Sequence, residues 1–244
     1  MKCKEGFLLK KIGFALLALL LLSPAHSLTL STIRTEVRVR IKDANASRQR
    51  YTDAQLNSII NQTQRDVVNF TWIIRKNTSI ELVSGTTYYT LPTDIIHIDR
   101  VTWRRRNVPE QTLQSLDSTA QFGDWQIAGG PPQSYFQDPT QSTKIGIQPW
   151  PNSSSSTGTV VVNYVSQATD LSSDSDVPFN AETRYYPWHD LLIYEPAYKI
   201  MLIEGEYQRA AEYRSYFETR LKSMMDNLGR KDNYIPGFSG PNPR

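Results

Sequence analysis

The chain has 244 residues, enough for one large domain or two small ones with a hydrophobic core. It carries 27 Lys and Arg against 24 Asp and Glu. Four of these Lys and one Glu lie in residues 1–27, which leaves 23 residues of each sign in the rest. Residues 28–244 therefore carry no net charge, which gives no support to a nucleic-acid partner. The only cysteine, Cys3, lies outside them, so they can form no disulfide and no thiolate metal site.

Residues 1–27 follow the pattern of a secretory signal peptide. Four lysines, Lys2, Lys4, Lys10 and Lys11, precede an uninterrupted apolar run at residues 12–22, and Ala25 and Ser27 stand at the −3 and −1 positions of a cleavage site. The apolar run is too short to span a bilayer. Two interpretations stay open. The segment is a leader that is cleaved after Ser27, or it is a wrongly assigned start or a gene fusion, with the true start at Leu28, Leu30 or Ile33.

Residues 28–78 are predicted to be the first part of a helical domain. Ser31 is expected to cap a short helix with apolar residues at Ile33, Val37 and Ile41. A second helix starts in YTDAQL, where Thr52 and Gln55 have the spacing of a capping box. Its buried stripe is expected to comprise Leu56, Ile59, Ile60, Thr63, Val67, Phe70 and Ile74.

Residues 79–180 are predicted to be a β domain, because the apolar period changes to two. The segments SIELV, TYYTLP, IIHIDRVTWRRR, KIGIQP and TVVVNYVS read as short strands, separated by Gly, Pro and Asn. Such strands favour an antiparallel sandwich or barrel. The segment LSSDSDVPFNAET that follows is expected to be a polar crossover.

Residues 181–228 are predicted to be the second part of the helical domain. Pro187 suits a first helical turn, Pro196 is expected to kink or split the helix, and Gly205 marks a break. A second buried stripe is expected at Tyr207, Ala210, Ala211, Phe217, Leu221, Met224 and Leu228. The predicted fold class is therefore α+β, a helical bundle from the N- and C-terminal segments with an inserted antiparallel β-sandwich or barrel. Residues 229–244 are expected to be a flexible tail.

Few residues of the sequence could form a catalytic site. His97 and Asp99 are expected on one strand face, as in a His–Asp pair, and His189 precedes Asp190 at a helix start. Neither is accompanied by a nucleophile motif or by a second metal ligand at helical spacing. The sequence also lacks the common catalytic and phosphate-binding motifs. We therefore expect no enzyme, no cofactor and no metal.

A basic run ends the segment IIHIDRVTWRRR. Strand alternation places Arg100, Arg104 and Arg106 on one face and Val101, Trp103 and Arg105 on the other. The first three could form a phosphate-facing patch, because guanidinium groups contact backbone phosphates without reading sequence. The alternative is a solvated strand end that guards against edge pairing.

Several motifs, each weak alone, occur in a fixed order along the body. They are RYTDAQLNSIINQTQRDV, SIELVSGTTYYTLPTDIIHIDRVTWRRR, DWQIAGGPPQSYF, KIGIQPWP, GTVVVNYV and WHDLLIYEPAYKIMLIEGEYQRAAEYRSYFETRL. In this order they resemble the head-to-tail adaptor proteins of tailed bacteriophages, the neck or tail tubular protein A-like family, from about Ser31 to Leu228. Two features depart from the family: Pro196, where such helices usually carry a small residue, and the leader.

The resemblance implies a structural virion protein, assembled in the bacterial cytoplasm, that forms a ring between portal and tail and continues the DNA channel. Its partners would be the portal protein, the tail or nozzle protein and further copies of itself as a dodecamer, with only non-specific passage of DNA and no membrane for the mature body. On this reading Arg100, Arg104 and Arg106 line the channel or a subunit interface. The tail would dock on the portal through Arg230, Lys231, Tyr234, Ile235 and Phe238.

Two other classes of function stay open. An exported bacterial β-rich binding module, periplasmic or on the cell surface, would use exposed aromatic residues for glycan or protein ligands, and its leader would be cleaved. A secreted hydrolase would use His97 or His189, and a single His→Ala change would abolish its activity.

Overall fold

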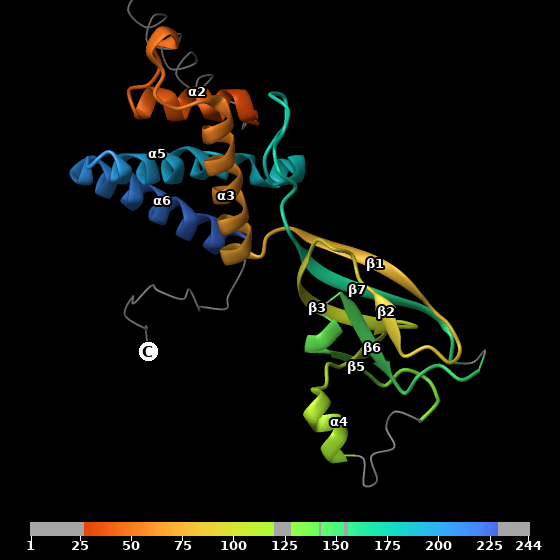
Figure 1. The fold of residues 1–244 in the computed structure, drawn as a ribbon. Coiled ribbons are helices and arrows are strands. Elements are labelled where there is room, and N and C mark those ends of the chain that lie inside the picture. The colour runs from red at the N-terminus through yellow and green to blue at the C-terminus, as the bar shows by residue number, and fades with distance from the viewer. Residues whose placement is uncertain (1–26, 120–127, 142, 154–155, 229–244) are drawn as a thin grey trace, which may run out of the picture. The chain divides into compact units, whose positions relative to one another are not determined.

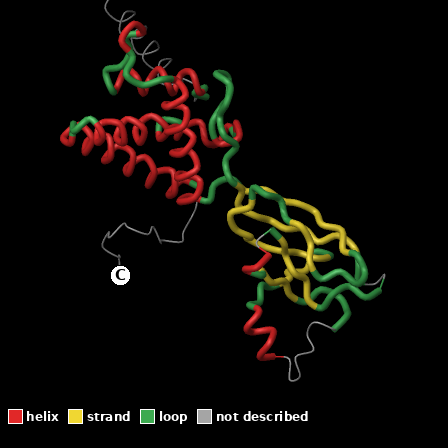
Figure 2. The backbone as a smooth tube through the Cα atoms, viewed as in Figure 1, coloured by secondary structure: helices red, strands yellow, loops and turns green. Residues whose placement is uncertain are grey.

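The chain forms two compact units, described in this computed structural model for residues 27–119, 128–141, 143–153 and 156–228 (Figure 1). One unit is helical and takes its chain from residues up to Gln64 and from Asp170 onward, and the other lies between Arg65 and Thr169. Helices make up the first unit and strands dominate the second (Figure 2). The fold class is α+β as predicted, with N-terminal helices packed on C-terminal helices and antiparallel sheets inserted between them in the sequence.

Helix α2 spans Leu30–Arg40 and buries Ile33 and Val37 as expected, together with Leu30; Ile41, the third residue expected, is buried at the C-cap. Its N-cap is Thr29, whose side-chain oxygen accepts a hydrogen bond from the Thr32 N–H at 3.4 Å. The prediction of Ser31 as the cap is therefore wrong. Helix formation begins two residues earlier because Leu30 is itself part of the buried face.

Helix α3 spans Asp53–Thr71 and starts with the predicted capping box. The Thr52 N–H donates to Gln55 Oε1 at 2.8 Å, and the Gln55 N–H donates to Thr52 Oγ1 at 3.2 Å. The helix ends at Trp72, which adopts a positive φ of 53°. Phe70, expected in the buried stripe, is 41% exposed, so that part of the stripe is wrong.

Polar side chains of α3 hold the crossover that follows the strands. The Asn61 side chain accepts a hydrogen bond from the Leu171 N–H at 2.8 Å and donates one to the Leu171 carbonyl at 2.9 Å. Gln64 accepts a hydrogen bond from the Phe179 N–H at 2.9 Å. These buried amides pair the backbone N–H and C=O of Leu171 and the N–H of Phe179, two buried residues of an irregular segment that has no strand neighbour to bond them.

The closing helices are α5, Leu191–Ile203, and α6, Tyr207–Asn227, which pack against each other. Gly205, with a φ of 76°, separates them as predicted. Pro196 does not split α5. It lies inside the helix, where its missing N–H removes one bond of the ladder, and its buried neighbours Glu195 and Ala197 hold the helix together. The segment before α5 is a pair of 3-10 helices, Phe179–Ala181 and Thr183–Trp188, and the second contains Pro187.

The strand unit is a sandwich of two antiparallel sheets. One sheet has the order β1-β7-β3-β4 and the other β2-β6-β5. A short helix, α4 at Leu113–Thr119, lies between β4 and β5 in the sequence. The expected boundaries at 78/79 and 180/181 fall inside β1 and inside the first 3-10 helix. The strands are β1 Arg75–Leu82, β2 Tyr88–Thr90, β3 Ile95–Trp103, β4 Arg106–Val108, β5 Ser134–Gln137, β6 Lys144–Gln148 and β7 Gly158–Ser166.

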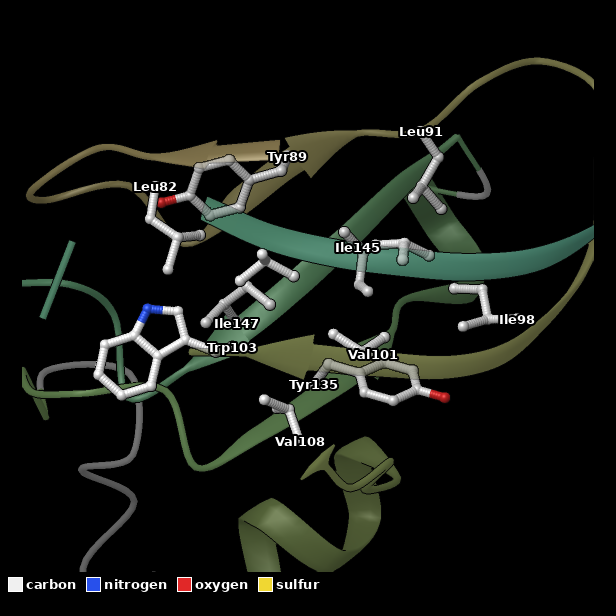
Figure 3. Close-up of a cluster of buried hydrophobic side chains, with 12 residues drawn as sticks. Leu82, Tyr89, Leu91, Ile98, Val101, Trp103, Val108, Tyr135, Ile145 and Ile147 are labelled. Atoms are coloured by element: carbon white, nitrogen blue, oxygen red, sulfur yellow. The ribbon is translucent and has the colours of Figure 1, made fainter. Parts of the chain in front are cut away.

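The core of the sandwich lies between its two sheets. Val101 and Trp103 from β3 face Ile145 and Ile147 from β6 (Figure 3). Side chains from all seven strands or their ends contribute to this cluster, as alternation in half-buried strands requires. Gly146 leaves room for the ring of Phe136, which lies across it from the paired strand β5.

Candidate functional site

The turn between β3 and β4 consists of Arg104, one of the three predicted arginines, and Arg105. Strand β3 ends at Trp103, and the chain reverses at Arg104 and Arg105, whose φ angles of 47° and 65° are both positive. Arg106 then opens β4, where it pairs with Trp103. Two positive φ angles in a two-residue connection are typical of a type I′ turn, which favours Asn and Gly. An Arg-Arg pair carries no such signal.

The prediction that Arg100, Arg104 and Arg106 share one face of one strand is therefore wrong. Arg104 lies in the turn, and Arg106, paired directly with Trp103, shares the face of that residue. Arg100 is exposed on the other face, because its neighbour Val101 is buried in the core. A β-bulge between Ile98 and Arg100 also interrupts the alternation on which the prediction depended.

The turn is a concentrated positive surface. Arg104, Arg105 and Arg106 are all exposed. The Arg104 guanidinium lies 4.5 Å from the ring centroid of Trp103, a cation–π contact that orients one of the three. Within the described part of the chain, no carboxylate forms an ion pair with any of them. Their charges are therefore available to an anionic or polar partner.

Arg100 belongs to a separate polar depression on the outer face of the larger sheet. The depression has a volume of about 320 Å³. The register of the strands places Asn77, Asn163 and Arg100 side by side across β1, β7 and β3. Arg75 Nε lies 3.5 Å from the Asp99 carboxylate at its margin. Polar groups and an excess of positive charge make this face suitable for a polar or anionic neighbour.

Asp94 fixes the start of β3 beside this face. Its carboxylate accepts hydrogen bonds from Lys76 Nζ at 2.8 Å, the Ser166 hydroxyl at 3.0 Å and the Tyr164 hydroxyl at 3.3 Å. Burial raises the pKa of Asp94, but the hydrogen bonds from Lys76, Ser166 and Tyr164 outweigh it and hold the pKa below its ordinary value. This is the aspartate of the motif TLPTD, and it ties three strands of one sheet together.

Neither histidine is part of a catalytic arrangement in the described residues. His97 stacks on Trp72, with ring centroids 4.5 Å apart, and Asp99 pairs with Arg75 instead. His189 is fully buried, and its Nδ1 accepts a hydrogen bond from the Leu28 N–H at 3.1 Å. Burial lowers the pKa of His189 to about 4, although the Leu28 hydrogen bond opposes this. The histidine is therefore a neutral, buried hydrogen-bond acceptor for the Leu28 N–H.

The helical unit exposes aromatic and apolar side chains that the sequence did not single out. Tyr207, expected in the buried stripe of α6, is 71% exposed, and so is Ile203 at 76%, both beside the turn between α5 and α6. The ring of Tyr194 lies 5.7 Å from that of Tyr216, with Arg40 over its face at 5.8 Å. Tyrosine and arginine are enriched at protein interfaces, so this surface suits a protein partner.

No group of three or more His, Cys, Asp or Glu side chains in the described part of the chain could hold a metal ion. None of the helices described is both long and apolar enough to cross a membrane. The predicted leader, apart from Ser27, and the predicted docking tail, with Arg230, Lys231, Tyr234, Ile235 and Phe238, lie outside the described residues.

Comparison with families of known proteins matches the chain to the SU10 adaptor protein over residues 28–241, which include parts of both units. The chain belongs to the SU10 adaptor protein family. Members of this family are phage head-to-tail adaptors, so the resemblance read from the order of the motifs is confirmed. A comparison with curated proteins finds no match.

The match relates the family to particular parts of the fold. It starts at Leu28, the first residue after the predicted leader and the residue whose N–H bonds His189. It contains the turn arginines, the polar depression and most of the predicted docking tail. Asn61, which lies within the motif RYTDAQLNSIINQTQRDV, is the side chain that holds the crossover.

Proposed function

We propose that the chain is a structural virion protein that forms a ring between portal and tail and continues the DNA channel between them. The observation that carries this proposal is the family match, which spans the helical unit and the strand unit together. The ring is a dodecamer, and the protein acts in the virion after assembly in the bacterial cytoplasm. Its neighbours are the portal protein and the tail or nozzle protein.

The arginines of the strand unit support a role at the channel or between subunits. Arg100 and the turn residues Arg104 and Arg106 are exposed on two separate surfaces of the sandwich. Guanidinium groups bind phosphate oxygens without reading bases, so either surface could guide DNA of any sequence. The body carries no net charge, which fits a passage through which DNA moves and to which it does not bind tightly.

The helical unit and the tail are proposed to dock on the portal. The exposed side chains of Ile203 and Tyr207 offer an apolar contact area at the turn between α5 and α6. The segment 229–244 follows α6 directly and contains both aromatic and basic residues, namely Arg230, Lys231, Tyr234, Ile235 and Phe238. Aromatic side chains and arginine are enriched at protein interfaces, so both segments are candidates for contact with the portal.

The test is to mix the purified chain with the portal rings of its own phage and to determine composition by native mass spectrometry. We expect a complex with a dodecamer of the chain. A variant that lacks residues 229–244 should lose portal binding while its thermal unfolding stays unchanged. Unimpaired binding by that variant would contradict the docking role of the tail. Failure of the full chain to bind would contradict the adaptor function.

The proposed place in the virion has its own test, which also addresses the leader. Peptide mapping of intact particles should find the chain with an N-terminal peptide that starts between Leu28 and Ile33. A chain found only in the periplasm, cleaved after Ser27, would support the exported binding module instead.

A further inference from the structure

Strand β1 is an unusually long free edge. It lies at the end of its sheet, and all eight of its residues pair with β7 in an unbroken register (Figure 1). The other edge strands of the sandwich, β2, β4 and β5, have three, three and four residues. Proteins usually keep edges short or protect them with bulges, proline or charged side chains. Strand β1 has no bulge and no proline, and its charges are those of Arg75, Lys76 and Glu81.

The register identifies the backbone groups that face outward. The Ser166 N–H donates to the Ile74 carbonyl at 2.8 Å, so Ile74 and Ser166 are a hydrogen-bonded pair. Bonded pairs alternate along an antiparallel ladder, so the even-numbered residues of β1 bond to β7. The N–H and C=O groups of Arg75, Asn77, Ser79 and Glu81 therefore point away from the sheet. No hydrogen bond from another described residue satisfies these outward groups.

The side chains of these four residues are also exposed. Their sequence is self-complementary when two copies of the strand are paired antiparallel. In an antiparallel pair of two β1 strands centred on Thr78, Arg75 of one copy stands opposite Glu81 of the other at both ends. Asn77 stands opposite Ser79. This register uses all four outward residues, and opposite charges in directly paired positions stabilise a sheet. A shift by two residues in either direction removes both charge pairs and leaves part of the edge unused.

The inner side of the strand permits this pairing. Lys76, the one charge there, is already compensated by Asp94 at 2.8 Å. Ile80 is partly buried against the core cluster at the sheet margin, and a second strand would cover it further. Arg75 keeps a side chain that is 66% exposed despite its contact with Asp99, so it can reach a second carboxylate.

We propose that β1 is a self-association edge, through which two copies of the chain join antiparallel about a two-fold axis at Thr78. The result is a dimer with one continuous sheet across both strand units. A two-fold contact occupies the edge of each copy once and cannot continue around a ring. It therefore goes beyond the adaptor ring, as a second mode of association with its own surface. Strand pairing alone buries little area, so the dimer is expected to be weak and to form at high concentration.

Disulfide trapping tests the register directly. In the proposed pair the two Thr78 residues face each other in a non-bonded position, where Cα atoms are about 4.5 Å apart, within the range that a disulfide spans. In a Cys3→Ser background, Thr78→Cys should form a disulfide-linked dimer on the order of ten-fold faster than Ser79→Cys, because pairing raises the effective concentration of the thiols. Ser79 is the matched control, since it is more exposed than Thr78 and would be favoured by random collision.

Charge exchange supplies an independent arm. In the Thr78→Cys chain, Glu81→Arg should slow dimer formation, since it sets arginine opposite Arg75 of the second copy. The double change Arg75→Glu with Glu81→Arg should restore the rate. Equal rates at Thr78→Cys and Ser79→Cys, faster linkage at Ser79→Cys, or no rescue by the double change would each overturn the proposal. Portal binding by the same variants is measured separately and does not depend on this edge.

Discussion

At the residue scale, Asp43 shows how one buried carboxylate organises a bend. Its oxygens accept hydrogen bonds from Arg38 at 2.8 Å, from the Arg50 N–H at 2.7 Å and from the Tyr51 N–H at 3.3 Å. Arg38 is buried as well, and it also reaches Asp53 at 2.7 Å. The carboxylate therefore joins the end of α2 to the start of α3.

We predict that Asp43→Ala lowers the free energy of unfolding by about 3 kcal/mol, because it leaves the buried Arg38 guanidinium with only one carboxylate and two backbone N–H groups without acceptors. Asp53→Ala is the matched control. Its carboxylate is 60% exposed, so we expect a loss of about 1 kcal/mol or less. Urea unfolding of both variants measures the difference. Equal losses would mean that Asp43 does not hold the bend.

His189 predicts a dependence of stability on pH. The folded protein keeps its pKa at about 4, below the ordinary value of 6.5 that it regains on unfolding. The unfolded chain therefore takes up a proton first as the pH falls, and stability is lost below about pH 6.5. The linkage gives a loss of about 2 kcal/mol between about pH 7 and about pH 5.

The variant His189→Asn isolates this contribution. Its side-chain oxygen can still accept the hydrogen bond from Leu28, but it does not titrate. Unfolding curves at both pH values should show a smaller loss for the variant than for the unchanged chain. The same loss in both would assign the pH dependence to other groups.

At the element scale, the glycine of β6 sets the distance between two strands. A Cβ atom on Gly146 would lie 2.2 Å from Cζ of Phe136, a fully buried ring on the paired strand. The ring also makes an edge contact with Tyr88, with centroids 5.6 Å apart. It is held on both sides and has little room to move.

Gly146→Ala should therefore lower the free energy of unfolding by about 1–3 kcal/mol through overpacking. Gly130→Ala is the control, since its nearest contact is an ordinary 3.7 Å to Pro149, and it should change stability little. Thermal unfolding compares the two. If Gly146→Ala is as stable as Gly130→Ala, the ring has another position available.

The elements that local chemistry defines could be predicted from the sequence, and those that depend on tertiary packing could not. The capping box at Thr52 and Gln55 and the break at Gly205 involve neighbours in the chain, and both predictions are confirmed. Phe70 and Tyr207 fit the helical period but are exposed, because periodicity does not tell which part of a helix is covered. The turn at Arg104 and Arg105 lacks the residues that favour positive φ, so the sequence gives no sign that the chain reverses there. Strand alternation therefore does not apply across these two residues.

At the scale of the whole molecule, the positive surfaces belong to the strand unit and the exposed aromatic surface to the helical unit. The sequence indicated the arginines as a group but not their separation between the depression and the turn. That separation makes the proposed roles of the two surfaces testable one at a time.

We compare two variants in phage that depend on the variant for assembly. One combines Arg104→Ser and Arg106→Ser, and the other carries Arg100→Ser alone; we predict that their defects differ. Arg48→Ser, an exposed arginine of the helical unit, is the control and should assemble normally. Electron microscopy of particles measures assembly, and nuclease protection measures retained DNA. Normal particles with retained DNA after replacement of all three strand-unit arginines would contradict a role at the channel or a subunit interface.

The division of the helical unit between the two ends of the chain has a consequence for synthesis. Residues 65–169 contain every strand of the sandwich, and the ribosome completes them before it makes α5 and α6. We expect the sandwich to fold first, while the apolar faces of α2 and of the first half of α3 remain exposed. The side chains of Asn61 and Gln64 would form their hydrogen bonds with Leu171 and Phe179 only after the crossover is made. Helix α5, which is made after the sandwich, then packs on α2, which is made before it.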